Sequence, residues 1–210
     1  MLQRPRLPTR REPRQGRAVA TRRTILTAAL KALREHGADV SMSRIAELSG
    51  YGIGTVYEYF PNRRTLLCEL MHQICEDELE AILALAPTLR DAPLATFVTR
   101  TVGLLVAWAE EHAVLTRLLA IEVIPTLQRD EIEDFEPLVA AALAAELGRR
   151  ADEVAAPDLA RAAQMIVRAV ESIIEDAVLQ RPHELAQPAF ADEIVALVLG
   201  YLGRARGSVS

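Results

Sequence analysis

Residues 41–67 have the sequence SMSRIAELSGYGIGTVYEYFPNRRTLL, and this stretch decides the fold of the chain. Ser41 is a good helix N-cap because its hydroxyl can accept an amide proton of the first turn. Gly50 falls where that helix must end, since glycine enters left-handed backbone geometry without steric cost. Pro61 stops a second helix that begins near Gly52. Two short helices joined by a tight turn predict a helix-turn-helix whose second helix enters a DNA major groove.

The same residues fit a more specific pattern. The run IAELSGYGIGTVYEYFPNRRTLL, preceded by TILTAALKALREHGADVSMS, resembles the TetR family of bacterial transcriptional regulators over about residues 21–67. The resemblance rests on I-A-x-x-x-G-x-x-x-G-T-x-Y-x-Y-F-x-x-R/K-x-x-L-L, which fixes many positions at once. Two positions depart: Gly52 replaces the usual capping Ser, and Ile53 replaces a frequent Lys. Ile53 removes a phosphate or base contact and offers an apolar one to a thymine methyl.

The resemblance implies a set of residues that contact DNA or lie close to it. The set comprises Ser41, Arg44, Ile53, Gly54, Thr55, Tyr57, Tyr59 and Arg63. Arg44 is expected to reach a base or a phosphate, and the position of Arg63 contacts a phosphate in the family. Tyr57 and Tyr59 are two apart on one helix and cannot share a face, so packing of one ring in the core is the alternative.

The distribution of charge agrees with a DNA-binding N-terminal part. The chain has 210 residues and a net charge of −5. Residues 1–66 contain 13 Lys and Arg against 5 Asp and Glu, whereas residues 67–210 contain 11 against 24. A basic end suits phosphate, and an acidic remainder suits solvent or a partner. Half of the residues are hydrophobic, so a sizeable core is available.

We expect an all-α fold of about nine helices in four segments. Residues 1–20 carry six Arg and three Pro and predict a flexible arm, which either follows DNA or is a solvated tail. Residues 21–67 form the helix-turn-helix domain, 68–203 a helical effector-binding and dimerisation domain, and 204–210 a tail. The first helix spans 21–36, and the helices beyond the helix-turn-helix span 62–86, 93–112, 113–121, 130–149, 157–180 and 189–202. Asn62 is the predicted N-cap of the helix at 62–86.

The last two predicted helices indicate a homodimer. Both are apolar over more than one face, which a monomer would leave partly exposed. In the resembled family the equivalent helices form a four-helix dimer interface. A two-fold dimer on double-stranded DNA implies a palindromic operator with half-sites roughly 34–36 Å apart. The predicted interface comprises Ile166, Val170, Ile174, Ile194, Leu197, Val198 and Tyr201.

The helical body also offers an apolar lining with few polar groups. Such a lining suits a small hydrophobic ligand. The predicted lining residues are Met71, Cys75, Phe97, Thr101, Leu104, Trp108 and Phe135. The resemblance implies that this ligand lowers DNA affinity by shifting the helix that begins at Asn62, which makes the protein a ligand-released repressor. A constitutive DNA-binding protein without an effector is the alternative.

Other functional classes find little support in the sequence. An all-α enzyme with a basic tail would need a nucleophile–base pair or a phosphate loop, and no P-loop, HExxH or GxSxG motif occurs. Cys68, His72 and Cys75 lie on one helix but match no zinc spacing, so we expect core residues rather than a metal or redox sensor, and no cofactor. Two cysteines suit a reducing cytosol, and no apolar run reaches the roughly 18 residues of a membrane span. We therefore expect a cytoplasmic protein without a membrane partner.

Overall fold

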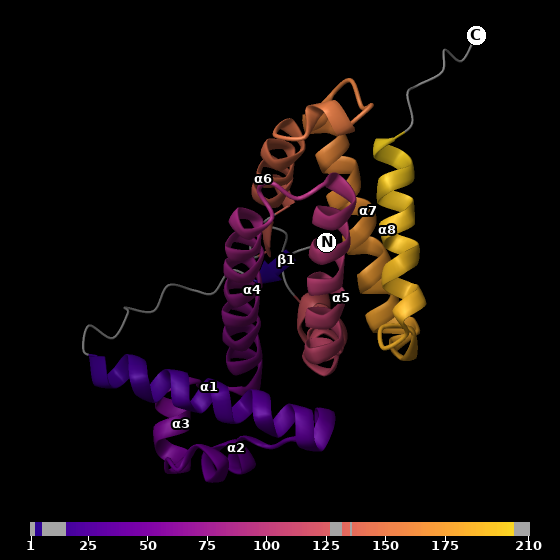
Figure 1. Cartoon of the computed structure of the whole chain (residues 1–210). Coiled ribbons are helices and arrows are strands. Elements are labelled where there is room, and N and C mark those ends of the chain that lie inside the picture. Colours follow the sequence, from indigo (N-terminus) through magenta and orange to yellow (C-terminus); the bar gives the residue numbers. More distant parts are fainter. Residues whose placement is uncertain (1–2, 6–15, 127–131, 135, 204–210) are drawn as a thin grey trace. The chain divides into compact units, whose positions relative to one another are not determined.

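The computed structural model describes residues 3–5, 16–126, 132–134 and 136–203 (Figure 1). Within these residues the chain is almost entirely helical, which confirms the predicted all-α class. The helices are α1 (Gly16–His36), α2 (Met42–Ser49), α3 (Ile53–Tyr59), α4 (Arg63–Thr88), α5 (Leu94–Leu118), α6 (Glu136–Gly148), α7 (Leu159–Gln180) and α8 (Pro188–Leu202). A π-helical turn, Leu119–Val123, continues α5. None of the described helices is long and apolar enough to cross a membrane.

Shorter elements complete the described chain. Two three-residue strands, β1 (Gln3–Pro5) and β2 (Ile132–Asp134), pair with each other, and the sequence analysis anticipated neither. Short 3-10 turns lie at Gly37–Asp39, Ile124–Thr126, Ala151–Glu153 and Pro182–Glu184.

Three predictions of helix extent were wrong. Helix α1 begins at Gly16, so residues 16–20, which were assigned to the flexible arm, are helical. The predicted helices 93–112 and 113–121 form one helix, α5, because no Gly or Pro separates them. Residues 132–134 of the predicted helix 130–149 form strand β2, and α6 begins at Glu136. Among the described residues, eight α-helices therefore stand where nine were predicted. The remaining arm residues 1–2 and 6–15 and the predicted tail 204–210 lie outside the described residues.

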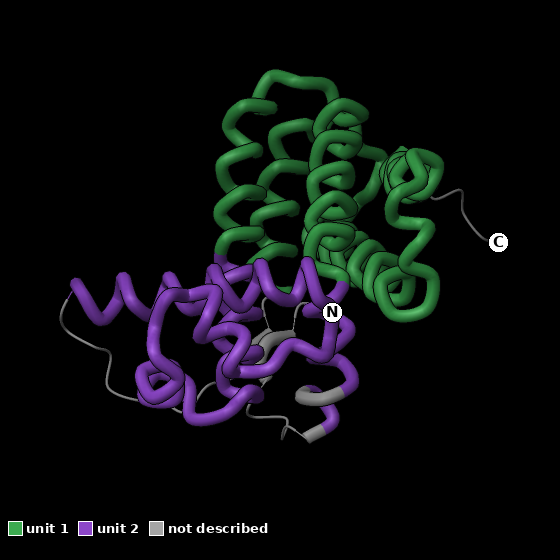
Figure 2. Tube along the Cα trace, turned by 90° about the horizontal axis from the view of Figure 1, so that it is seen from below, with its two compact units in different colours: residues 1–3, 77–113, 134–210 green, residues 4–76, 114–133 purple. Residues whose placement is uncertain are grey.

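The chain divides into two compact units (Figure 2). The N-terminal unit comprises residues 4–76 and 114–133, and the C-terminal unit comprises residues 1–3, 77–113 and 134–210. Both α4 and α5 pass from one unit to the other. The first half of α4 therefore groups with the helix-turn-helix, although the sequence placed a domain boundary at residue 67.

The core of the N-terminal unit lies between α1 and the helix-turn-helix. Ala29 and Ala32 of α1 are fully buried, and their small side chains allow α2 to pack closely against α1. Val56 of α3 and Phe60, which ends α3, are also fully buried. Each buried apolar side chain contributes roughly 1.5–3 kcal/mol of transfer free energy, so the inner faces of α2 and α3 fix how the outer faces are presented.

The core of the C-terminal unit is built by α5, α6, α7 and α8. Buried side chains recur along α7 at helical spacing and pack with inner faces of the other three helices. Helix α7 begins at Leu159 rather than at the predicted Pro157. Asp158 is its N-cap, because the Asp158 carboxylate accepts a hydrogen bond from the Arg161 backbone N–H at 2.9 Å. The largest buried members are Leu94, Phe97, Leu147, Ile166, Leu185, Ile194 and Leu202.

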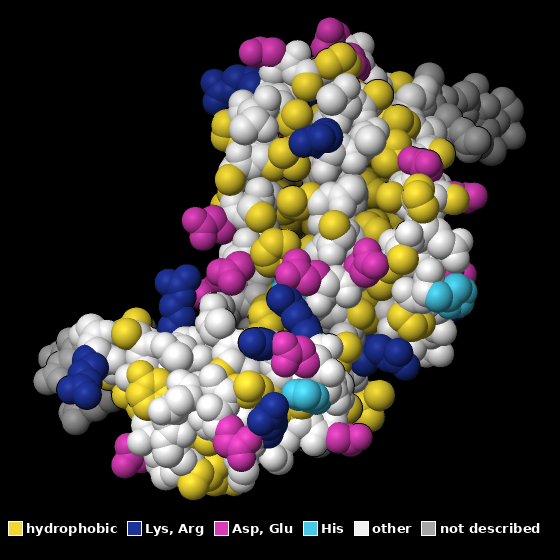
Figure 3. All heavy atoms as spheres, turned by 60° about the horizontal axis from the view of Figure 1, so that its bottom comes forward, with side chains coloured by type: hydrophobic (Ala, Val, Ile, Leu, Met, Phe, Trp, Pro, Cys, Tyr) yellow, Lys and Arg dark blue, Asp and Glu magenta, His cyan; other side chains and the backbone are white. Residues whose placement is uncertain are grey.

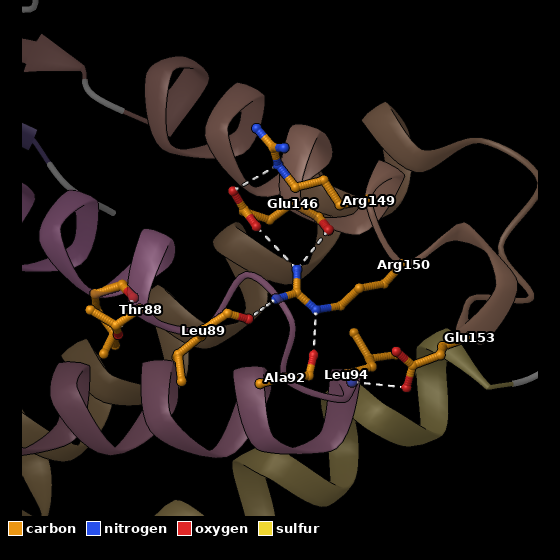
Figure 4. Close-up of polar contacts among 9 residues, drawn as sticks. Thr88, Leu89, Ala92, Leu94, Glu146, Arg149, Arg150 and Glu153 are labelled. Carbon is orange, nitrogen blue, oxygen red and sulfur yellow. Dashed lines mark hydrogen bonds and ion pairs between the residues drawn. The ribbon is translucent and has the colours of Figure 1, made fainter.

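A buried arginine ties the loop between α4 and α5 to the end of α6 (Figure 4). The Arg150 guanidinium donates to the backbone oxygen of Ala92 at 3.1 Å and to that of Leu89. It also donates to the Glu146 carboxylate at 3.0 Å and lies 4.5 Å from the centre of the Phe97 ring. These contacts satisfy the donors of a side chain that is almost fully buried.

Candidate nucleic-acid interface

The turn between α2 and α3 has the geometry that the sequence predicted. The Ser41 hydroxyl accepts a hydrogen bond from the Arg44 backbone N–H at 3.2 Å and caps α2. Gly50 ends α2 with a φ of 74°, a conformation that favours glycine. Gly52 precedes α3 with extended backbone angles. The local structure is a helix-turn-helix whose second helix is α3.

The outer side of this motif exposes the predicted DNA-contacting residues. Ile53 is 41% exposed and Tyr57 is 48% exposed, and their spacing of four places them on one face of α3. Ser41, Arg44 and Gly54 are also exposed. We call these five residues the reading face. In Figure 3, where the end of the molecule that carries α1–α3 comes forward, hydrophobic side chains lie at the surface among basic and acidic ones.

The other three predicted contact residues are partly buried. Thr55, Tyr59 and Arg63 are intermediate in exposure, so the two tyrosines of α3 do lie on different faces. The Arg63 guanidinium donates to the backbone oxygens of Ala38 and Val40. Arg63 thus joins the first turn of α4 to the segment before α2, a role that the sequence did not reveal.

Further polar contacts hold the motif in place. The Asn62 side chain accepts the Thr65 backbone N–H at 2.8 Å, which confirms the predicted N-cap of α4. The Arg44 guanidinium pairs with the Glu47 carboxylate at 2.9 Å on the surface of α2. Arg22 of α1 forms an ion pair with Glu69 of α4. Helices α1 and α4 are therefore tied to each other, and α1 also packs against α2.

The predicted ligand-lining residues are divided between the two units. Met71 and Cys75 belong to the N-terminal unit, and Thr101, Leu104 and Trp108 are half-buried positions of α5 in the C-terminal unit. Phe97 is buried in the core of the C-terminal unit, and Phe135 lies outside the described residues.

Trp108 and His112 form a polar–aromatic pair in α5. Their ring centres are 5.1 Å apart, and His112 Nδ1 lies 2.8 Å from the Trp108 backbone oxygen. The indole Nε1–H of Trp108 is buried and has no hydrogen-bond partner among the described residues. A buried donor of this kind costs about 1–3 kcal/mol, so it favours an acceptor at this position.

Two acidic residues were missed by the sequence analysis. Burial and, to a smaller extent, the charge of Glu171 together raise the pKa of the Glu78 carboxyl to about 7. Glu78 lies between Ile74 and Ile82 at a spacing of four, inside the apolar stripe of α4. An acidic residue that interrupts an apolar stripe was the signal available in the sequence.

The predicted dimer residues fall into two groups. Ile166, Val170, Ile194 and Val198 are buried in the core of their own chain, and Ile174 packs against it. Leu197 is 51% exposed, and Tyr201 lies beside it on the outer face of α8. The inner group therefore packs within the protomer, whereas the outer group, Leu197 and Tyr201, is exposed and available to a partner.

The described residues contain no group of three or more His, Cys, Asp or Glu side chains placed to hold a metal ion. Cys68 is buried and Cys75 is half-buried, and neither forms a disulfide in the described part of the chain. Both positions agree with packing roles on α4.

Two family models match the sequence. The model described as "Tetracyclin repressor-like, C-terminal domain" matches residues 93–202, more than half of the chain. The chain belongs to the TetR family of bacterial transcriptional regulators. The model described as "Bacterial regulatory proteins, tetR family" matches residues 25–70, which contain the helix-turn-helix. The TetR resemblance of the motif is thus confirmed, and members of this family are generally DNA-binding regulators rather than enzymes.

Several solved structures share the fold of this chain. A TetR-family transcriptional regulator from Mesorhizobium loti MAFF303099 is 24% identical in sequence, with a TM-score of 0.66. The match covers 89% of this chain and 98% of that chain. A transcriptional regulator from Cytophaga hutchinsonii ATCC 33406 is 16% identical, with a TM-score of 0.67 and coverages of 90% and 100%. RolR in complex with resorcinol is 20% identical, with a TM-score of 0.56 and coverages of 90% and 91%. No curated protein matches the sequence.

Proposed function

We propose that this TetR-family regulator represses transcription from a palindromic operator and leaves it when a small molecule binds its helical C-terminal part. The observation that carries the proposal is the two-sided recognition helix α3. Its inner residue Val56 is fully buried, while Ile53 and Tyr57, at other positions around the same helix, are exposed. A helix held so firmly on one side can present the other side to a DNA groove with little loss of entropy.

In this proposal DNA is contacted from three elements. Arg44 of α2 supplies a charged donor, and its ion pair with Glu47 limits the directions in which the guanidinium points. Thr55 and Tyr57 offer hydroxyl groups from α3, and Tyr59 lies on another face of the same helix. Ser41 and Arg63 lie at the starts of α2 and α4. Hydroxyl and backbone contacts to phosphates would fix the register, and groove contacts would select the sequence.

The proposed homodimer uses the outer faces of α7 and α8. Met165 of α7 is exposed, as are Leu197 and Tyr201 of α8. Ala196 and Gly200 are also exposed on α8, and small residues there allow a partner helix to approach closely. A second copy of the chain is the proposed partner because a two-fold pair presents two reading faces to a palindromic site.

The proposed effector is a small, mainly apolar molecule with at least one hydrogen-bond acceptor. Thr101 and Leu104 on α5 provide partly exposed surface near Trp108 along the helix, and the buried Trp108 N–H provides a donor. RolR, which shares the fold, has been solved with resorcinol bound, so a cyclic small molecule is a sensible first class to screen. Release of DNA requires that the ligand bind the DNA-incompetent state more tightly.

The proposal is tested with the full-length protein and a fluorescent duplex library from the DNA flanking its own gene. We expect a shifted duplex that is lost on addition of an active compound and a change in Trp108 fluorescence with that compound. A tenfold loss of affinity corresponds to about 1.4 kcal/mol of coupling between the two sites. If operator binding is specific but no compound in a broad panel changes either signal, the constitutive-regulator alternative replaces the effector part of the proposal.

A further inference from the structure

The first turn of α3 has a composition that the protein's own fold does not explain. Gly52 and Gly54 flank Ile53, and neither glycine has a positive φ. A Cβ added at either glycine would meet nothing within 4 Å in the described structure. Glycine inside a helix costs about 1 kcal/mol relative to alanine. Gly54, inside α3, therefore weakens the helix, and Gly52 is a poorer N-cap than Ser would be. Neither glycine relieves strain or crowding within the described structure.

The absence of side chains on both sides of Ile53 leaves its neighbourhood open to an outside partner. Within the described residues, α3 receives no side-chain cap at Gly52, and Gly52 itself is exposed. Gly54 lies next to Ile53 on the exposed side of α3. A missing Cβ on each flank allows another molecule to come close to the backbone. The benefit of glycine at these two positions is therefore a closer contact with another molecule, not a contact within the protomer.

Ile53 itself is an exposed, branched apolar side chain at a position where charge would be expected. It forms a stripe with Tyr57 one turn later on the exposed face. Its χ1 angle is stiff, so little rotamer entropy is lost when it is buried against a partner. Among base edges in the major groove, the C5-methyl of thymine is the apolar group that distinguishes one base from the others.

From these observations we propose that Ile53 is a specificity-determining residue that contacts the C5-methyl group of one thymine in each operator half-site. Gly52 and Gly54 allow the helix backbone to approach that base edge. Arg44, on the neighbouring helix, provides the polar contacts that an apolar first turn of α3 cannot make. The inference rests on the proposed DNA-binding function and adds a base preference to it.

The test begins with selection of duplexes from a random library by the full-length wild-type protein. Each symmetric pair of thymines in the selected site is then replaced by uracil, which removes only the methyl group. We expect the replacement of one of these thymine pairs by uracil to lower the affinity of the wild-type protein about tenfold, because two methyl groups are no longer buried. We also expect cytosine at that position to bind weakly and 5-methylcytosine to recover part of the loss.

Variants identify the side chain that senses the methyl group. Ile53→Ala should bind the thymine and uracil operators with equal affinity, whereas Leu83→Ala, at an exposed leucine of α4, should retain the wild-type preference. Circular dichroism checks that each variant is folded. The comparison of thymine and uracil operators with the wild-type protein does not depend on the folding of any variant. The inference is overturned if no thymine-to-uracil change matters to the wild type, or if Ile53→Ala keeps the preference. A library from which no sequence is enriched would overturn the proposed function itself.

Discussion

Buried charges dominate the energetics at the scale of single residues. Arg150 sits in a nearly closed site, where backbone oxygens, Glu146 and the Phe97 ring replace water around its guanidinium. Glu78 is in the opposite situation, because burial and Glu171 both disfavour its charged form. The charge of Arg150 is compensated by its partners, and the side chain holds the loop between α4 and α5. The charge of Glu78 destabilises the folded protein by an amount that varies with pH.

We predict that Arg150→Ala destabilises the protein by roughly 2–4 kcal/mol, because it removes several hydrogen bonds and leaves the partner groups buried without a donor. Urea unfolding followed by circular dichroism measures the change. Arg149→Ala is a matched control, since Arg149 is exposed and pairs with the same Glu146 carboxylate at 3.3 Å. Its effect should stay below about 1 kcal/mol. Equal effects of the two substitutions would contradict the anchoring role of Arg150.

We predict that Glu78→Gln stabilises the protein in a pH-dependent manner. The folded protein retains the Glu78 proton up to about pH 7, whereas the unfolded chain releases it near the ordinary pKa of 4.5. Wild-type stability therefore falls as the pH rises through this window and then stays level. The gain from Glu78→Gln should be larger at pH 8 than at pH 5 by roughly 2 kcal/mol in urea unfolding. Glu80→Gln, at an exposed position of α4, controls for loss of a surface charge, and a pH-independent gain would refute the account.

At the scale of elements, local signals proved more informative than periodicity. The N-caps Ser41 and Asn62 and the left-handed Gly50 were predicted correctly because each depends on a few neighbouring residues. The length of α5 was predicted incorrectly, because apolar periodicity alone cannot show where one helix ends and the next begins when no Gly or Pro marks the boundary. The carbonyl contacts of Arg63 were also beyond sequence reasoning, because they join residues far apart in the chain.

For the recognition helix we predict that Thr55→Ala and Tyr57→Phe each weaken operator binding about 5–30-fold, the effect of one lost hydrogen bond to DNA. Thermal unfolding of both variants should match the wild type, because neither hydroxyl is needed to hold α3 on its core. Thr27→Ala is the control: its exposed hydroxyl bonds within α1 to the Arg23 backbone oxygen at 2.9 Å. Wild-type affinity of both α3 variants in fluorescence anisotropy would show that these hydroxyls do not contact DNA.

At the scale of the whole molecule, sequence patterns could not separate core from interface. Ile166 and Ile194 satisfy the apolar periodicity of α7 and α8 by packing inside the protomer. Leu197 satisfies the same periodicity on the outside. Only the packed structure distinguishes the two, because both faces are apolar in the sequence. The basic N-terminal part and acidic remainder, by contrast, are evident from composition, and they fit one end that binds DNA.

We predict that Leu197→Glu converts a dimer to a monomer at micromolar concentration, because two buried carboxylates would face each other across a two-fold axis. Sedimentation velocity measures the change. Leu138→Glu places the same charge at an exposed leucine of α6 and should leave the dimer intact. A wild-type protein that sediments as a monomer, or a dimer that survives Leu197→Glu, would exclude this interface.

The most direct test of the account is competition between the selected operator and a scrambled duplex of equal length for the full-length wild-type protein. Specific recognition by two reading faces predicts a preference of roughly 1,000-fold or more for the operator at physiological salt. Binding to the scrambled duplex should fall steeply with salt, because phosphate contacts alone support it. Equal affinity for the two duplexes across the salt range would contradict the proposal that this protein recognises a DNA sequence through α3.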